Sequence, residues 1–230
     1  MIPRYNCRSS NLRCGLCAGF TLLEVVAALA ISAILIFLAC AALQSIHAAS
    51  QQTRCLAHLR VINQGTLAYA ADHGGVLPSS ADPPEQPGNT DGIWYHYREL
   101  IAPYCGGLGS RDLGKIFTCP ADHNLAPDYP SYLLNGGNEF DARLPGIAGR
   151  RLSVINHPSR TVLVAEAGAF HPYSWHEPKS GGERTYDGAR NVISFCDGHL
   201  GFLPIFRDPR HEYAAEADPP PQYCYQWSPD

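Results

Sequence analysis

The feature that most constrains this chain is an apolar run at residues 25–43, VVAALAISAILIFLACAAL, in which Ser32 is the only clearly polar residue. In an α-helix this run extends about 28 Å, close to the thickness of a bilayer's hydrocarbon core. An ordinary secretory signal peptide has a shorter apolar region and gains nothing from an acidic residue such as Glu24 at its leading edge. The run therefore predicts a membrane-spanning helix.

The segment before this run is polar and basic, since Arg4, Arg8 and Arg13 are the only charged residues before Glu24. Because basic flanks stay on the cytoplasmic side of a membrane, the pattern places the N-terminal end inside and the rest of the chain across the membrane. The formal net charge is -4, and no other basic patch stands out. This balance argues against a nucleic-acid partner.

Helical character is predicted to continue beyond the membrane, because residues 44–73 contain no proline and only one glycine, Gly65. Apolar and small residues recur there at spacings of three and four and form one stripe: Leu56, Leu59, Ile62, Thr66, Tyr69 and Ala70. Two glycines and then Pro78 supply a stop signal. We expect a transmembrane helix at 20–43 that continues as an amphipathic helix at 44–75.

The rest of the chain is predicted to form an α+β head at residues 76–206 and an irregular, proline-rich tail at 207–230. A short helix is expected at 93–104. Apolar, β-branched runs predict strands at 131–134, 161–165, 191–196 and 199–203. The last two runs flank Asp197-Gly198, a strong signal for a tight hairpin turn.

The stretch Gly19-Phe20-Thr21-Leu22-Leu23-Glu24, followed directly by the apolar run, closely resembles the class III signal of type IV prepilins and type II secretion pseudopilins. The resemblance implies a pilin-like fold, in which a long N-terminal helix packs on a small antiparallel sheet. It also implies that a prepilin peptidase cuts after Gly19 and that Phe20 is then N-methylated. Glu24 would pair with the N-terminal amine of a neighbouring subunit, since a carboxylate near the hydrocarbon edge needs a partner.

A second resemblance, to a subgroup of pseudopilin-like proteins, covers later segments. Its matching stretches are Cys55–Gly65, Phe117-Thr118-Cys119-Pro120, residues 158–163 and the closing box at 191–198. In the subgroup this box begins with a His ten residues before the Asp-Gly pair. Here Asp187 occupies that position, so the role of the family's His cannot be transferred to it.

The cysteines beyond the membrane run permit at most two disulfides in an oxidising compartment. Cys105 with Cys119 would close a short glycine-rich loop, whereas Cys55 with Cys119 would tie the head to the long helix. The sequence leaves both pairings open. Cys40 lies within the apolar run, where we expect it to act as a small apolar residue.

No catalytic residue and no metal ligand is predicted. The histidines of the head form no H-x-x-x-H or H-E-x-x-H pattern, and His176-Glu177 lacks a second histidine at helical spacing. G-x-S-x-G, P-loop and GxGxxG motifs do not occur in the sequence. No cofactor is expected, although Asp197, Asp208 and Asp218 are carboxylates that a calcium site in the C-terminal part would use.

Together these patterns predict a structural subunit of a filament and not an enzyme. The expected place is the inner membrane, with a single span and the head in the periplasm or in a pilus or pseudopilus. The resemblance implies four partners: a prepilin peptidase, other pilin or pseudopilin subunits, an inner-membrane platform protein and membrane lipid. Two alternatives are a monomeric membrane-anchored binding protein and a signal-anchored enzyme with an unrecognised site.

Overall fold

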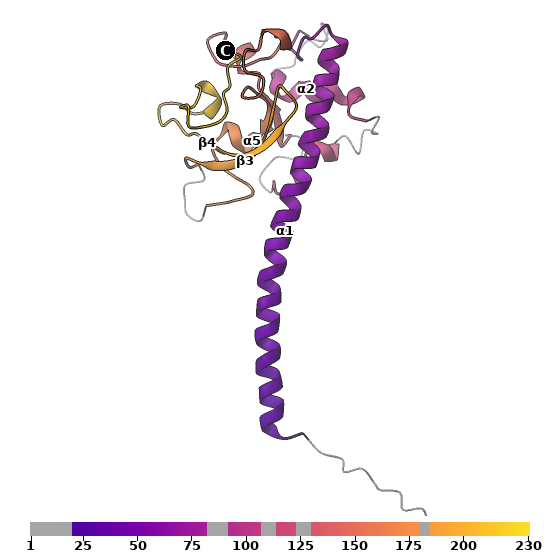
Figure 1. Ribbon diagram of the computed structural model, residues 1–230, viewed down its shortest axis with the longest axis vertical. Helices are drawn as coiled ribbons and strands as arrows, with labels where there is room; N and C mark the ends of the chain where they lie inside the picture. Colours follow the sequence, from indigo (N-terminus) through magenta and orange to yellow (C-terminus); the bar gives the residue numbers. More distant parts are fainter. Residues whose placement is uncertain (1–19, 82–91, 107–113, 123–129, 180–184) are drawn as a thin grey trace, which may run out of the picture. The chain divides into compact units, whose positions relative to one another are not determined.

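The computed structural model describes residues 20–81, 92–106, 114–122, 130–179 and 185–230. The chain divides into two compact units, Met1–Ser45 and Ile46–Asp230. The predicted leader at 1–19, with Gly19, lies outside the described residues. Helix α1 runs from Leu22 to Asp72 and contributes to both units (Figure 1). Its bounds agree with the helix predicted to begin near Phe20, and it ends where Gly74 and Gly75 adopt positive φ angles of 65° and 82°.

The head contains one four-stranded antiparallel sheet with the strand order β1-β2-β3-β4. Every predicted strand is present, with small differences at the ends. The bounds are Tyr132–Leu134 for β1, Val162–Glu166 for β2, Ala189–Phe195 for β3 and Leu200–Ile205 for β4. Each strand is therefore a hydrogen-bonded neighbour of the next strand along the chain.

The pairing of β2 with β3 changes register between Val162 and Ala165. Ser194 lies at this irregularity, and its hydroxyl donates to the Val164 carbonyl at 2.9 Å and accepts the Val164 N–H at 3.2 Å. A side chain thus replaces ladder hydrogen bonds where the strands do not match. This arrangement satisfies the buried backbone of Val164.

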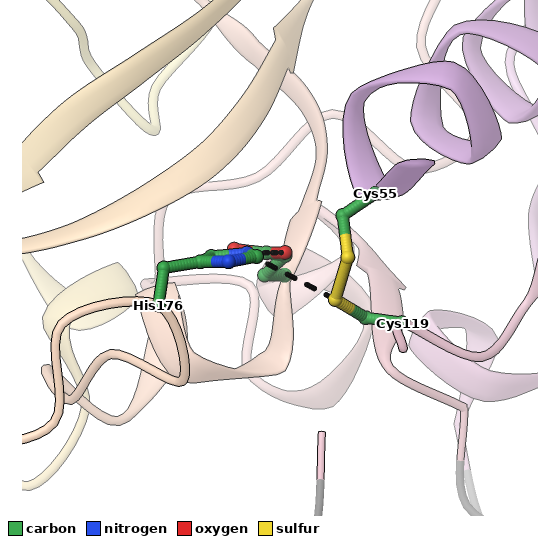
Figure 2. A group of neighbouring side chains, drawn as sticks. Cys55, Cys119 and His176 are labelled. Carbon is green, nitrogen blue, oxygen red and sulfur yellow. Dashed lines mark hydrogen bonds and ion pairs between the residues drawn. A yellow bond between two sulfur atoms is a disulfide. The ribbon is translucent and has the colours of Figure 1, made fainter. Parts of the chain in front are cut away.

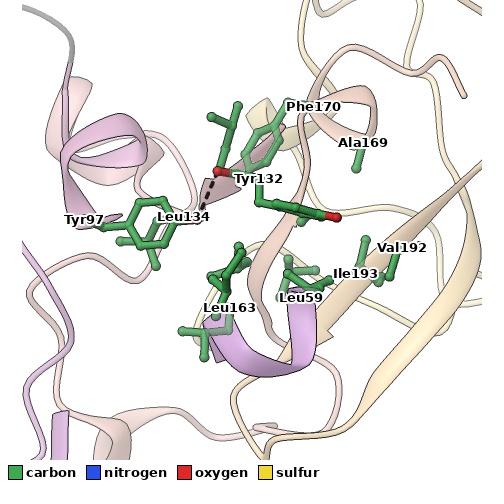
Figure 3. Packing of buried hydrophobic residues seen from close by; sticks show 14 of the residues in the cluster. Leu59, Tyr97, Tyr132, Leu134, Leu163, Ala169, Phe170, Val192 and Ile193 are labelled. Atoms are coloured by element: carbon green, nitrogen blue, oxygen red, sulfur yellow. Dashed lines mark hydrogen bonds between the residues drawn. The ribbon is translucent and has the colours of Figure 1, made fainter. Parts of the chain in front are cut away.

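The second half of α1 packs against the core of the head. Most of the predicted stripe is buried, namely Leu59, Ile62, Thr66, Tyr69 and Ala70, while Leu56 is half-buried. Leu59 belongs to the same buried cluster as Leu163 of β2 and Ile193 of β3 (Figure 3). The three-and-four spacing of the stripe therefore marks the face of the helix that covers the sheet.

Helix α2, Ile93–Ile101, buries Ile93, Tyr97 and Ile101, which lie four residues apart on one face. The Tyr97 hydroxyl donates to the Tyr132 carbonyl at 3.0 Å, and the Tyr132 hydroxyl donates to the Cys55 carbonyl at 3.2 Å. These bonds connect α2, β1 and α1. The predicted helix at 93–104 is thus α2 followed by the 3-10 turn Ala102–Tyr104.

Two single-turn helices, α4 (Gly137–Phe140) and α5 (Ala167–Phe170), were not predicted. Four residues are too few to show a helical period, and α5 lies directly after β2. All four residues of α5 are buried. Its position therefore depends on the packing of the head and not on local sequence pattern.

The C-terminal residues are mostly irregular, as predicted, but they belong to the core. Tyr225 and Trp227 are buried, and the ring of Trp227 lies 5.0 Å from that of Phe170, measured between centroids. Val162 N–H donates to the Gln226 carbonyl, and Gln226 N–H donates to the Arg160 carbonyl. The end of the chain therefore runs beside the start of β2.

The long N-terminal helix and the small antiparallel sheet confirm the predicted α+β, pilin-like architecture. The arrangement follows from two periodicities in the sequence. The period of 3.6 marks the buried stripe of α1, and short β-branched runs mark the strands.

Candidate functional site

The N-terminal end of α1 carries the residues that the sequence assigns to processing and assembly. Gly19 lies outside the described residues, whereas Phe20 and Glu24 are described. The Phe20 side chain is exposed, and it immediately precedes Thr21, the residue that caps α1.

Thr21 and Glu24 form a capping box. Thr21 N–H donates to Glu24 Oε2 at 2.8 Å, and the Thr21 hydroxyl donates to the same oxygen at 2.9 Å. Glu24 N–H in turn approaches the Thr21 hydroxyl oxygen at 3.3 Å. This reciprocal pattern satisfies backbone donors that the first turn of a helix leaves unpaired.

The capping box gives Glu24 a second possible role beside the predicted pairing between subunits. A carboxylate in the first turn also interacts favourably with the helix dipole. Any pairing with the amine of another subunit must therefore compete with, or add to, the contacts that Thr21 makes. Sequence reasoning missed this role, although the spacing T-x-x-E at a helix start was a signal for it.

The first half of α1 exposes a nearly continuous apolar surface. Its exposed large apolar side chains include Val25, Val26, Leu29, Ile31, Ile34, Leu35, Ile36, Phe37, Leu38 and Leu43. Among the described residues, α1 is the one helix that is both long enough and apolar enough to cross a membrane, judged by length and composition. The exposed run fits a membrane anchor.

Of the two cysteine pairings that the sequence left open, the structure contains the disulfide between Cys55 and Cys119. It joins α1 to the segment before β1. Cys105 and Cys196 are buried free thiols, and Cys40 and Cys224 are exposed. Burial raises the pKa of Cys105 to about 11 and that of Cys196 to about 12, so both thiols are neutral at ordinary pH.

A buried carboxylate and an imidazole lie beside this disulfide. Glu166, the last residue of β2, is fully buried, and its Oε1 lies 2.9 Å from His176 Nε2. Val192 N–H donates to the other oxygen, Oε2, at 2.8 Å. Burial raises the pKa of Glu166, and the bonds from His176 and Val192 oppose that rise.

The same histidine nitrogen lies 3.9 Å from Cys119 Sγ (Figure 2). Figure 2 shows the His176 ring directed towards the disulfide of Cys55 and Cys119. The sequence analysis missed this cluster, because it considered His176 only together with the adjacent Glu177 as part of a metal-binding motif. The actual partner is Glu166 on β2, and a single acidic residue at the end of a buried strand gave only a weak signal.

The three carboxylates considered for calcium are held by donors of the chain itself. Asp197 accepts from the backbone N–H of His199 at 3.1 Å, and Asp218 accepts from the backbone N–H of Ser228 at 3.0 Å. Asp208 forms a two-pronged ion pair with Arg210, and this contact lowers the pKa of Asp208 to about 2. Each of the three carboxylates therefore accepts hydrogen bonds from the chain itself.

Asp187, which stands at the position of the subgroup's His, has a structural role. One carboxylate oxygen accepts from the Arg207 N–H at 2.9 Å, and both oxygens lie 3.1 Å from the Tyr223 hydroxyl. Asp187 therefore links the segment before β3 to the segment after β4 and to the C-terminal region.

Comparison with known families gives one match. The family described as the prokaryotic N-terminal methylation motif matches residues 16–39. This range contains Gly19, Phe20, Glu24 and most of the apolar run, and it confirms the resemblance to a prepilin-type signal. Neither a curated protein nor a solved structure matches the chain.

Proposed function

We propose that this chain is a structural subunit of a type II secretion pseudopilus or of a type IV pilus-like filament. One observation carries the proposal: the methylation motif continues, in register, into a helix whose apolar surface is exposed. A helix with such a surface is stable only in lipid or against other apolar helices. A filament subunit uses both environments in turn.

The proposal includes processing at the cytoplasmic face of the inner membrane. A prepilin peptidase cuts after Gly19, the basic leader is released, and Phe20 becomes the methylated N-terminus. The head lies in the periplasm, where a disulfide such as that between Cys55 and Cys119 is stable. The further partners are other subunits of the same filament, an inner-membrane platform protein and membrane lipid.

In the proposed filament, Glu24 meets the new amine of Phe20 from a neighbouring subunit. The carboxylate already accepts two hydrogen bonds from Thr21 in its own chain. A carboxylate has about four lone-pair positions, so it can keep an intrachain donor while it accepts one from another chain. This pairing would neutralise two charges in an apolar bundle and set the stagger between helices.

The test is co-expression of the full chain with a prepilin peptidase, followed by intact mass measurement. We expect the chain to lose residues 1–19 and to gain one methyl group when the methylating activity is present. Gly19→Val should stay at full length, because the peptidase has to accommodate the residue before the cut. Cleavage at another position, or normal shortening of Gly19→Val, would contradict the proposed processing.

A second measurement addresses the polymer directly. Cells that also express the assembly ATPase and platform protein are sheared, and the released fraction is probed for the chain. We expect the processed chain in sheared filaments. If it is processed but remains entirely in the membrane as a monomer, the chain is a membrane-anchored protein and not a filament subunit.

A further inference from the structure

The two cysteines of the disulfide and the neighbouring Glu166 and His176 form a cluster of four side chains. Cysteine, glutamate and histidine are all residue types that bind metal ions in proteins. The candidate ligand atoms of Cys55, Cys119, Glu166 and His176 lie within 4.8 Å of one another. Cys55, Cys119 and Glu166 are buried, and the His176 side chain is almost fully buried. They come from α1, the segment before β1, the end of β2 and the segment after α5, so the fold and not local sequence brings them together.

Two sulfurs, one imidazole nitrogen and one carboxylate oxygen are donors that zinc accepts in tetrahedral sites. We propose that the reduced form of this cluster, with the Cys55–Cys119 bond broken, binds one Zn²⁺ ion through Cys55, Cys119, His176 and Glu166. The disulfide form and the zinc form exclude one another, because the disulfide bond occupies both sulfurs. This inference does not depend on the proposed function.

The conversion balances with a dithiol as reductant. The dithiol passes two electrons and two protons to the Cys55–Cys119 bond and becomes a cyclic disulfide, and the chain gains two thiols. Binding of Zn²⁺ then releases both thiol protons to solvent. The proton between His176 Nε2 and Glu166 Oε1 moves to Nδ1 or to solvent, so that His176 binds through Nε2 as a neutral ring and Glu166 binds as a carboxylate.

The distances already present are close to those that a zinc ion requires. Zinc–sulfur bonds of about 2.3 Å and zinc–nitrogen bonds of about 2.0 Å place neighbouring tetrahedral ligands roughly 3.4–3.8 Å apart. His176 Nε2 lies 3.9 Å from Cys119 Sγ and 2.9 Å from Glu166 Oε1. These two separations need to change by less than about an ångström, and the main movement is the separation of the two sulfurs after reduction.

The surroundings of Glu166 also fit the role of a ligand. Val192 N–H holds Oε2 at 2.8 Å and leaves Oε1 directed at His176. An outer hydrogen bond of this kind fixes the orientation of a metal ligand. Two thiolates, one carboxylate and Zn²⁺ sum to a charge of −1, so the metal ion neutralises most of the charge of its three anionic ligands.

The experiment uses the full chain in detergent. One sample is oxidised, and the other is reduced with excess dithiol that is removed by anaerobic gel filtration. Both are incubated with Zn²⁺, separated from free metal and analysed for bound zinc. We expect one zinc per reduced chain and none in the oxidised chain. Equal binding by both forms, or no binding by the reduced form, would overturn the proposal.

Two variants test the ligands. His176→Gln retains a hydrogen-bonding side chain beside Glu166 but removes the imidazole, and we expect zinc affinity to fall at least about 100-fold. Cys105→Ser removes a different buried thiol and should bind zinc like the unchanged chain. Unchanged affinity in His176→Gln, or lost binding in Cys105→Ser, would contradict the proposed ligand set.

A spectroscopic measurement keeps the test independent of how well the variants fold. Co²⁺ added to the reduced, unchanged chain should give thiolate-to-metal charge-transfer absorption and the visible bands of a tetrahedral site. Zn²⁺ should displace this signal with a stoichiometry of one. An octahedral spectrum without a sulfur band would show that the two cysteines are not ligands and would overturn the proposal.

Discussion

Asn63 of α1 donates a hydrogen bond from its side-chain amide to the backbone carbonyl of Phe195 on β3, across 3.0 Å. Both residues are buried, and they lie 132 positions apart in the chain. The bond meets β3 at the turn that leads into β4. A buried polar side chain next to the apolar stripe of α1 therefore fixes the position of the hairpin on the helix.

Replacement of Asn63 by alanine should lower the free energy of unfolding by about 1–3 kcal/mol, because a buried hydrogen bond is lost and a cavity is left. Gln64→Ala, at the next position on the exposed side of α1, is the matched control and should have little effect. Denaturant melts of the purified chain measure both. Equal stability of the two variants would show that the bond to Phe195 contributes nothing.

The turn between β3 and β4 depends on Gly198, whose φ angle is +96°. Gly198→Val should destabilise the head by more than about 1 kcal/mol, because a β-branched residue rarely adopts this region. The space itself is adequate, since an added Cβ would lie 3.6 Å from the nearest atom of Leu67. Gly198→Asn should therefore destabilise the head less than Gly198→Val, because asparagine adopts positive φ angles more readily. Thermal melts measure both variants, and a lower melting temperature for Gly198→Asn than for Gly198→Val would contradict the argument from the backbone.

Gly65 of α1 faces Cys105, and a Cβ at position 65 would lie only 2.7 Å from the Cys105 sulfur. Gly65→Ala should therefore destabilise the unchanged chain, although alanine is the better helix former by about 1 kcal/mol. In a Cys105→Ala background the obstruction is gone, and the same substitution should stabilise. A double-mutant cycle measured by chemical denaturation tests this change of sign. Destabilisation in both backgrounds would mean that the sulfur is not the cause.

The buried thiols should be inert in the folded protein. Burial raises the pKa of Cys105 to about 11 and of Cys196 to about 12, so at pH 8 almost no thiolate is present at either site. Alkylation at pH 8, followed by peptide mass analysis, should label the exposed Cys224 and leave both buried thiols unmodified. After denaturation Cys105 and Cys196 should react, and labelling of Cys105 in the native chain would contradict its burial.

The parts of the fold that the sequence predicted are those with local signals. The hairpin around Asp197-Gly198 follows from two adjacent apolar runs and a turn pair, and the buried stripe of α1 follows from a helical period. Each pattern lies within one continuous segment of the chain. Each could therefore be recognised without knowing which other segments pack against it.

The parts that were missed depend on contacts between distant residues. The choice of Cys119 as the partner of Cys55, the burial of Trp227 and the pairing of Glu166 with His176 each join segments that no local pattern relates. A single cysteine or glutamate has the same local appearance whether it is exposed or buried. The four ligand atoms of the proposed zinc cluster lie close together only in the folded chain. The cluster therefore could not be predicted from the sequence.

The prediction that most directly tests the proposed function concerns Glu24. Glu24→Ala should insert into the membrane, since the apolar run at 25–43 is long and apolar enough alone, and it should be cleaved normally, since Gly19 is unchanged. It should fail to enter filaments, because the amine of Phe20 in the neighbouring subunit would be left without a carboxylate in an apolar bundle. Glu24→Asp should be partly tolerated because it keeps the charge.

Thr21→Val separates this role from helix capping. It removes the hydroxyl that binds Glu24 Oε2 but leaves the carboxylate available to another subunit. If Glu24 acts through the amine of a neighbour, Thr21→Val should assemble far better than Glu24→Ala. If Glu24 acts only through its capping box, Thr21→Val should lose assembly as well, although it keeps the bond from the residue 21 N–H to Glu24 Oε2. Membrane fractionation, filament shearing and crosslinking measure these steps, and normal assembly of Glu24→Ala would favour a membrane-anchored monomer.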